Sequence, residues 1–384
     1  MVTNTLFECK NKKVLLYLGK FPAYGFDIDG GSILANQLIN ALKKVCILDV
    51  VFIRKHDEVF IDNEVRDIRY VKYQNAEENK FIRRLKNLES NRKALERFNE
   101  YDVIITAHVS KFFGMQTYGS EFWNKTILFP MFCTKSYQLA GEIVPPEYTH
   151  MEYEVLCRVN KIITPSEIEK DDLIRDYQCN EHKIKLIRRG LSPLIKRRPN
   201  YEIHNPPRLT YIASIKKQKN HFAIIELLTI FKSLNINLEL YLVFTIQEKI
   251  LYNKFCKQIS SMDLDKMIIW HEAISQEELA EILYQSDINI SMSLWETFGR
   301  GIFEGMAAGL PTFVFDKLQN VRNICGNNQG IYFAKNISDM AEAIFKLIQD
   351  KEKYKFLSDE AVKMAANFSY NAERDALVKE ILSG

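Results

Sequence analysis

The sequence ISMSLWETFGRGIFEGMAAGLPTFVF, residues 290–315, combines an apolar strand, a Gly-x-Gly turn and a helical pattern, in that order. The strand is expected over 288–291, the turn contains Gly299 and Gly301, and Pro311 closes the helix. A turn of this kind exposes backbone N–H groups at the positive end of the helix dipole. The stretch therefore predicts a strand that leads into a helix N-terminus suited to phosphate.

Two carboxylates, Glu296 and Glu304, flank this turn. If the helix begins near Arg300, Glu304 lies in its second turn and Glu296 lies on the loop before it. Carboxylates bind phosphate poorly but accept hydrogen bonds from sugar hydroxyls, so the pattern predicts a ligand that carries both phosphate and hydroxyl groups. The spacing is equally compatible with a surface helix whose two acids favour its N-terminus, because short motifs also match by chance.

Short apolar runs alternate with helical patterns along the whole chain, which is typical of doubly wound parallel sheets. Two series of strands are expected, which predicts two Rossmann-like halves. A basic, proline-punctuated stretch at 190–207 separates the two series and has the composition of a linker. The predicted strands are 14–18, 45–52, 103–106, 126–129 and 161–164 in the first series, and 208–212, 238–244, 267–270, 288–291 and 312–315 in the second.

Composition places the chain among ordinary globular proteins. Its 384 residues favour two or three domains, with 47% hydrophobic and 26% charged residues. The net charge of +3 is too small to indicate nucleic-acid binding. The seven cysteines are scattered without a Cys-x-x-Cys pair, which argues against a zinc site or a disulfide framework and favours the cytoplasm. Neither a signal peptide nor a membrane-spanning run is evident.

The stretch at 290–315 resembles the signature of retaining, family 4 glycosyltransferases (glycosyl transferases group 1), and the resemblance extends over most of the chain. It implies a GT-B fold, an α/β architecture of two facing Rossmann-like domains with parallel sheets. A C-terminal helix would cross back to the first domain after a break at 367–370. The implied domains are 1–190 with 367–384, which would bind the acceptor, and 191–366, which would bind the nucleotide-sugar in the cleft between them.

The resemblance also implies roles for single residues. In such enzymes the acid at position 296 faces the donor sugar and the acid at 304 holds the ribose of the nucleotide. The expected catalytic residues are Glu296, His108 and Lys219. The expected donor-binding residues are Gly30, Gly31, Ser214, Lys219, Thr297, Phe298, Gly299, Arg300, Gly301 and Glu304.

Two features of the first half match this pattern. Asp29-Gly30-Gly31-Ser32 follows the first strand and precedes a predicted helix over 33–44, and paired glycines let a backbone approach a ligand closely. The alternative is a plain helix start capped by Asp29 or Ser32. His108 follows the strand at 103–106, at the end where doubly wound sheets bind ligands. The alternative is a histidine satisfied at the sheet edge.

One segment departs from the family pattern. Residues 211–221 resemble the loop whose arginine and lysine hold the donor diphosphate. Lys219 occupies the lysine position, whereas Ser214 replaces the arginine and Ala213 the preceding glycine. A hydroxyl does not replace a bidentate arginine–phosphate contact. Compensation is expected from Arg300, or from Lys216 or Lys217. The alternative is that the lysines form a solvated face.

The predicted function is thus retaining transfer of a hexose-type sugar from a nucleotide-sugar, most simply a UDP-sugar, to a glycan, lipid-linked or protein acceptor. No metal or other cofactor is expected. Two alternatives stay open: a non-catalytic GT-B subunit that stabilises a partner transferase, and a GT-B sugar-nucleotide epimerase. The basic segment 80–97 is compatible with a helix on the inner membrane face, although such a run more often forms a solvated surface.

Overall fold

The computed structural model describes residues 9–19, 30–54, 59–72 and 79–382. Within these ranges the chain divides into two compact units. The first unit holds the described residues up to 188 together with 371–382, and the second unit holds 189–370. None of the helices in the described ranges is long and apolar enough to cross a membrane.

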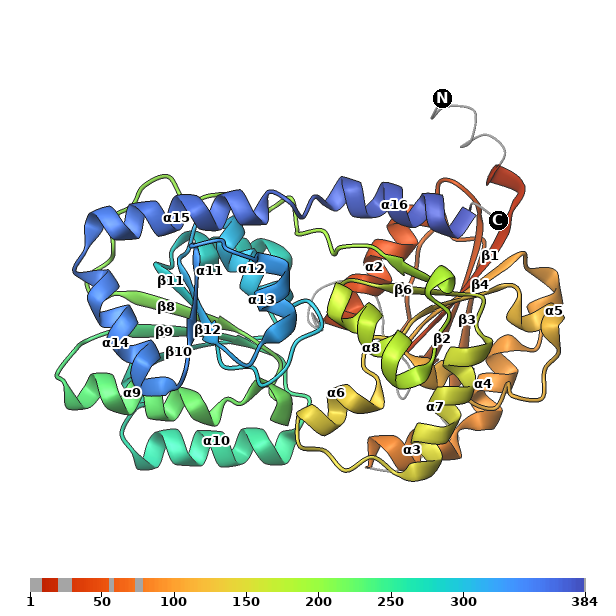
Figure 1. Cartoon of the computed structure of the whole chain (residues 1–384), viewed down its shortest axis with the longest axis horizontal. Helices are drawn as coiled ribbons and strands as arrows, with labels where there is room; N and C mark the ends of the chain where they lie inside the picture. The colour runs from red at the N-terminus through yellow and green to blue at the C-terminus, as the bar shows by residue number, and fades with distance from the viewer. Residues whose placement is uncertain (1–8, 20–29, 55–58, 73–78, 383–384) are drawn as a thin grey trace. The chain divides into compact units, whose positions relative to one another are not determined.

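The first unit is built on a sheet of seven parallel strands in the order β3-β2-β1-β4-β5-β6-β7. Figure 1 labels β1 to β4 and β6 of this sheet. Its central strands are almost wholly apolar and buried, as expected for a parallel sheet covered on both faces. The strands are β1 (Lys13–Leu18), β2 (Ile47–Arg54), β3 (Asp67–Lys72), β4 (Val103–Ala107), β5 (Thr126–Phe129), β6 (Lys161–Thr164) and β7 (Ile184–Leu186).

Helices cover both faces of this sheet. Residues of α2 and α16 pack on one face with Val14, Leu16 and Leu18 of β1. The C-terminal segment thus joins the core of the first unit through Leu377 and Ile381 of α16. The helices of the unit are α2 (Gly30–Leu42), α3 (Lys80–Lys86), α4 (Leu88–Leu95), α5 (Ser120–Trp123), α6 (Thr134–Leu139), α7 (Pro146–Arg158), α8 (Glu167–Tyr177) and α16 (Tyr370–Leu382).

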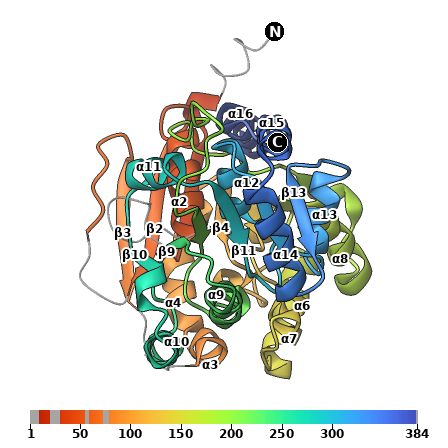
Figure 2. The same ribbon diagram turned by 90° about the vertical axis from the view of Figure 1, so that its left-hand side faces the viewer.

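The second unit contains a sheet of six parallel strands in the order β10-β9-β8-β11-β12-β13. The strands are β8 (Arg208–Ile212), β9 (Glu239–Phe244), β10 (Ile268–Glu272), β11 (Ile288–Ser291), β12 (Thr312–Phe315) and β13 (Ile331–Ala334). Residues of α9, α10 and α14 pack on one face, and residues of α11, α12 and α13 pack on the other (Figure 2). The helices are α9 (Phe222–Ser233), α10 (Lys249–Ser261), α11 (Gln276–Tyr284), α12 (Arg300–Ala307), α13 (Gln319–Cys325), α14 (Ile337–Ile348) and α15 (Lys351–Ala365).

The predicted fold class is confirmed, because both sheets are parallel and each predicted strand is present within two residues. The sequence missed β3, β7 and β13, which are all edge strands. Charged residues interrupt β3 (DIRYVK) and β7 (IKL), so these two lack the continuous apolar run on which the prediction depended, whereas β13 (IYFA) was missed although it is apolar.

Two helix predictions were wrong in detail. Helix α2 begins at Gly30, so Gly30 and Gly31 lie in its first turn rather than in a loop before it, and Ser32 is buried inside the helix. Asp29 lies outside the described residues. The basic segment 80–97 is divided into α3 and α4 by Asn87, whose side-chain amide donates to the Arg83 carbonyl (2.6 Å).

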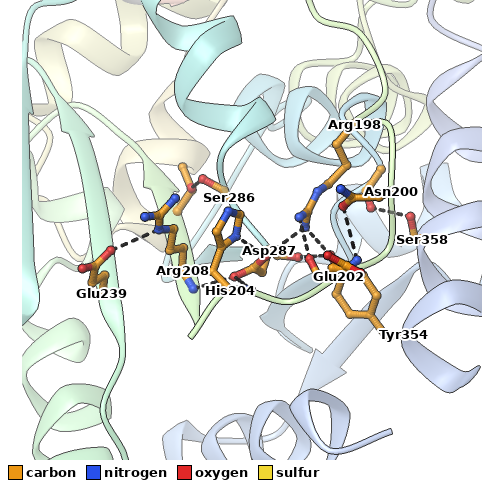
Figure 3. Close-up of polar contacts among 12 residues, drawn as sticks. Arg198, Asn200, Glu202, His204, Arg208, Glu239, Ser286, Asp287, Tyr354 and Ser358 are labelled. Carbon is orange, nitrogen blue, oxygen red and sulfur yellow. Dashed lines mark hydrogen bonds and ion pairs between the residues drawn. The ribbon is translucent and has the colours of Figure 1, made fainter. Parts of the chain in front are cut away.

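The linker that opens the second unit is held by a buried ion pair at the N-terminal end of β11. Asp287 accepts hydrogen bonds from the guanidinium of Arg198 (2.9 Å) and from the backbone N–H of Arg208 (2.8 Å), and His204 Nδ1 lies 2.9 Å from the same carboxylate (Figure 3). Tyr354 of α15 donates to the Asp287 carbonyl (2.8 Å). The segment 198–208 is therefore fixed to the sheet end opposite to the one where β11 leads into α12.

A buried carboxylate gives the first unit a pH-dependent stability. Glu152 accepts from the Thr134 N–H and the Tyr177 hydroxyl, both at 2.7 Å, while its second oxygen has no partner within the described ranges. Burial raises the pKa of Glu152 to about 7 from an ordinary value of 4.5. The folded state therefore holds this proton more tightly than the unfolded chain, and stability falls as the pH rises through this window.

We expect the Glu152→Gln variant to lack this part of the pH dependence. Between pH 4.5 and 8 the free energy of unfolding of the wild type should fall by ~3 kcal/mol more than that of the variant. Urea unfolding of both proteins at several pH values measures the difference, in which all other titrations cancel. Parallel stability curves for the two proteins would contradict the prediction.

Candidate functional site

The predicted strand, turn and helix of residues 288–307 are present as β11, a loop and α12. Gly299 precedes the helix with φ +85°, a left-handed conformation that glycine adopts without strain. No side chain caps the helix at this position. Within the described part of the chain the backbone N–H of Gly301 has no acceptor. The helix therefore presents an available donor at the positive end of its dipole, as an anion site requires.

Close packing fixes the start of α12 on the sheet. A Cβ atom on Gly301 would lie 3.0 Å from the Cβ and the carbonyl oxygen of Ile212 in β8, so only glycine fits comfortably. The buried side-chain amide of Asn289 in β11 donates to the carbonyls of Gly301 and Ile302, both at 3.2 Å. The first helical turn is thus held against two neighbouring strands, at the C-terminal end of β8 and beside β11, and ligands of doubly wound sheets bind at the C-terminal ends of strands.

Glu304 is enclosed in the second turn of α12, with 2% of its surface exposed. Its Oε1 lies 3.8 Å from Nη1 of Arg300 and accepts no hydrogen bond from any described residue. Burial raises the pKa of Glu304, and the positive charge of Arg300 opposes this rise. A buried carboxylate oxygen without a donor is costly. The geometry therefore leaves an acceptor that a ligand with hydroxyl groups could satisfy.

Glu296 and Lys219, which are 77 residues apart in sequence, form an ion pair through Oε1 and Nζ. Their side chains are only 10% and 16% exposed. Lys219 ends a short 3-10 turn (Lys217–Lys219) after β8, and Glu296 lies on the loop after β11. Because β8 and β11 are adjacent in the sheet, both loops leave from the same edge and bring the two side chains together.

Several residues that the sequence did not single out hold these two loops. The Tyr211 hydroxyl donates to the Lys219 carbonyl, and the Gln218 side chain donates to the Trp295 carbonyl. Asn320 of α13 donates to the carbonyl of Glu296 (2.9 Å). All four residues are buried, but only Tyr211 and Asn289 lie inside apolar segments, whereas Gln218 and Asn320 lie among polar neighbours. An apolar setting could have drawn attention to Tyr211 and Asn289, but a sequence does not tell which carbonyls they reach.

Three other predicted donor-binding residues, Phe298, Thr297 and Ser214, have partners within the fold. The Phe298 ring packs against Phe303 (4.7 Å between ring centroids) and Phe368 (5.2 Å), so a ligand contact at 298 would come from its backbone. The Thr297 carbonyl is 3.4 Å from the Asn320 amide. The Ser214 hydroxyl accepts from Thr245 (3.0 Å) and thus has a partner within the fold.

His108 lies in the first unit, immediately after β4, in a strained conformation with φ +87°. Its Nδ1 accepts from the Ser110 N–H (3.2 Å), so Nε2 carries the hydrogen and donates to the Tyr137 hydroxyl (3.0 Å). Burial, followed by the charge of Arg84, lowers the pKa of His108 well below its ordinary value. The imidazole is therefore neutral and suited to orientation or hydrogen bonding rather than to charge stabilisation.

The predicted site residues thus fall into two groups. Lys219, Glu296, Arg300 and Glu304 are gathered in the second unit, around the C-terminal ends of β8 and β11. His108 belongs to the first unit, as do Gly30 and Gly31 in the first turn of α2. Apart from the adjoining residues and the backbone of α2, no described atom lies within 4 Å of the position where Gly30 would carry a Cβ.

Comparison with known structures shows the same fold throughout the chain. Sucrose-phosphate synthase from Thermosynechococcus elongatus matches with a TM-score of 0.80 at 16% identity, covering 96% of this chain and 97% of that protein. HepE from Anabaena, in complex with UDP and glucose, matches with a TM-score of 0.76 at 14% identity, covering 97% of this chain and 100% of that protein. A glycosyltransferase from Rickettsia africae matches with 0.65 at 17% identity over 97% and 99%.

Comparison with curated protein sequences found no match. The family model described as glycosyl transferases group 1 matches residues 195–373, which include Lys219, Glu296 and Glu304 and nearly the whole second unit. Residues 195–373 thus resemble the glycosyl transferases group 1 family, and the chain has the GT-B fold of its structural neighbours.

Proposed function

We propose that the protein transfers a hexose-type sugar from a nucleotide-sugar to an acceptor hydroxyl, with retention at the anomeric carbon. The observation that carries the proposal is Glu304, a buried carboxylate on α12 with one oxygen that no described residue satisfies. The two ribose hydroxyls of a nucleotide are donors of the right kind for this carboxylate. The N–H groups at the neighbouring helix tip donate to the phosphate oxygens, so the first two turns of α12 recognise both parts of the nucleotide.

The leaving group is stabilised electrostatically in this mechanism. The bond between the anomeric carbon and the diphosphate oxygen breaks, and a bond from that carbon to the acceptor oxygen forms. The proton of the acceptor hydroxyl passes to the departing diphosphate on the same face of the sugar. The Lys219 ammonium and the N–H groups at the start of α12 offset the negative charge that develops on the diphosphate. Glu296 accepts hydrogen bonds from the sugar hydroxyls.

UDP is the nucleotide we propose first, supported by the structural likeness to HepE, which was solved with UDP and glucose. The acceptor, a glycan, a lipid-linked sugar or a protein, is assigned to the first unit, where Gly30, Gly31 and His108 supply backbone and imidazole contacts. Lysine and helix-tip amides take the place of a metal ion in this scheme, so we propose transfer without a divalent cation.

A second candidate is a non-catalytic GT-B subunit. It is favoured by one observation, that position 214 holds a serine whose hydroxyl is engaged with Thr245 instead of an arginine that grips phosphate. Such a protein would lack transferase activity and would act through a partner enzyme.

One assay separates the two candidates. The protein is incubated with UDP-, GDP- and ADP-sugars, and nucleotide release and thermal shift are recorded for each. Thermal stabilisation by one donor and slow release of its nucleotide support the transferase. A chain that neither binds nor consumes any of these donors would overturn the proposal and favour the non-catalytic subunit.

The Glu304→Ala variant tests the role of the buried carboxylate. Loss of hydrogen bonds to a charged acceptor should weaken UDP binding by ~10- to 100-fold in calorimetry while the protein stays folded. Glu342→Ala is the matched control, because Glu342 is an exposed carboxylate of the same unit, 64% accessible in its pair with Lys346. Equal UDP affinity of wild type and Glu304→Ala would remove Glu304 from the nucleotide site.

A further inference from the structure

The ion pair between Lys219 and Glu296 joins the two side chains that the proposed mechanism uses separately. In addition to the ion pair, each of the two residues has its backbone carbonyl held by a hydrogen bond from a buried side chain. Tyr211, which is 1% exposed, fixes the Lys219 carbonyl, and Asn320, which is 5% exposed, fixes the Glu296 carbonyl. Buried anchors on both sides make the pair a built-in feature of the site rather than a chance contact between surface side chains.

This pairing sets two anions in competition for one ammonium group. A diphosphate that binds Lys219 brings its own negative oxygens beside the Glu296 carboxylate. Like charges at contact distance repel, and little solvent is present to screen them because both side chains are mostly buried. A bare nucleoside diphosphate therefore has to displace Glu296 from Lys219 and offers the carboxylate no new partner.

An intact nucleotide-sugar differs from the diphosphate in one respect that matters here. Its sugar hydroxyls are hydrogen-bond donors and can replace the ammonium as partners of Glu296. The carboxylate then stays satisfied while Lys219 turns to the phosphate. The cost of breaking the ion pair is thus offset for the donor substrate but not for the diphosphate product.

We infer that the Lys219–Glu296 ion pair makes the site select the intact nucleotide-sugar against the nucleoside diphosphate left after transfer. This inference rests on the proposed function and deepens it, because it assigns Glu296 to product release as well as to sugar recognition. When the sugar leaves, Glu296 recaptures Lys219 and weakens the hold on the diphosphate.

The test measures UDP and UDP-glucose binding by calorimetry to the wild type and to Glu296→Gln, which removes the charge but keeps a side-chain acceptor. We expect Glu296→Gln to bind UDP ~10-fold more tightly than the wild type, and the preference for UDP-glucose over UDP to fall by a similar factor. The same substitution in a Lys219→Gln background should change UDP affinity by less than ~3-fold, because no ion pair is left to break.

Glu342→Gln serves as the control, since it neutralises the carboxylate of the exposed Lys346–Glu342 pair in the same unit. It should leave both affinities unchanged. Unchanged or weaker UDP binding by a folded Glu296→Gln protein would overturn the inference alone. Absence of binding to UDP-, GDP- and ADP-glucose and to their diphosphates by the wild type would overturn the proposed function itself, so the two failures are distinguishable.

Discussion

Replacing Lys219 by alanine is expected to lower the rate of sugar transfer by ~100- to 1000-fold, the usual effect of removing one preorganised donor from a developing negative charge. The reason lies in the placement of the ammonium group. The Lys219 side chain is 16% exposed and its backbone carbonyl is held by Tyr211, so the ammonium group has only to turn from Glu296 to the diphosphate. Initial rates at saturating donor measure the effect.

Two controls separate this loss from a folding defect. Lys346→Ala removes an exposed lysine that also pairs with a glutamate, and it should retain full activity. Because Lys219→Ala leaves Glu296 buried without its partner, thermal unfolding of the variant is compared with that of Lys219→Ala/Glu296→Ala, in which neither charge is present. A folded Lys219→Ala protein with turnover within ~3-fold of the wild type would exclude Lys219 from leaving-group stabilisation.

The Asp287→Ala variant should lose ~3–5 kcal/mol of folding stability, as expected when one partner of a buried ion pair is removed. Asp287 is fully buried, and the substitution would leave the Arg198 guanidinium, 3% exposed, without its carboxylate. It would also remove the acceptor for the backbone N–H of Arg208, where β8 begins (Figure 3). The linker and the N-terminal ends of β8 and β11 should loosen together.

Chemical unfolding in a Trp123→Phe background measures this effect, because Trp270 and Trp295 then report on the second unit alone. Asp359→Ala is the matched control. Asp359 pairs with the neighbouring Arg197, but these side chains are 34% and 39% exposed, so the loss should stay within ~1 kcal/mol. Similar losses for both variants would show that the Asp287 cluster adds nothing beyond a surface ion pair.

Much of the fold could be predicted from the sequence, because strands and turns depend mainly on residues that are neighbours in the chain. Central strands such as 208–212, 288–291 and 312–315 coincide with β8, β11 and β12, since a strand buried on both faces must be continuously apolar. The turn at Gly299 and the start of α12 at Arg300 also follow from local sequence, because glycine adopts the left-handed conformation before a helix more readily than other residues. The edge strands β3 and β7 escaped prediction, since charged residues interrupt them and remove that signal.

The candidate site is where tertiary structure decided most. The sequence singled out Lys219 in the segment 211–221, and Glu296, Arg300 and Glu304 in the segment 290–315. That Lys219 pairs with Glu296, across 77 residues, follows only from the adjacency of β8 and β11 in the sheet. The burial that leaves Glu304 Oε1 without a donor among the described residues likewise depends on how closely Gly301 lets α12 approach Ile212. The sequence by itself determined the residue types and their local spacing. Charge pairing and desolvation depend on contacts between distant segments, which only the packed sheet brings together.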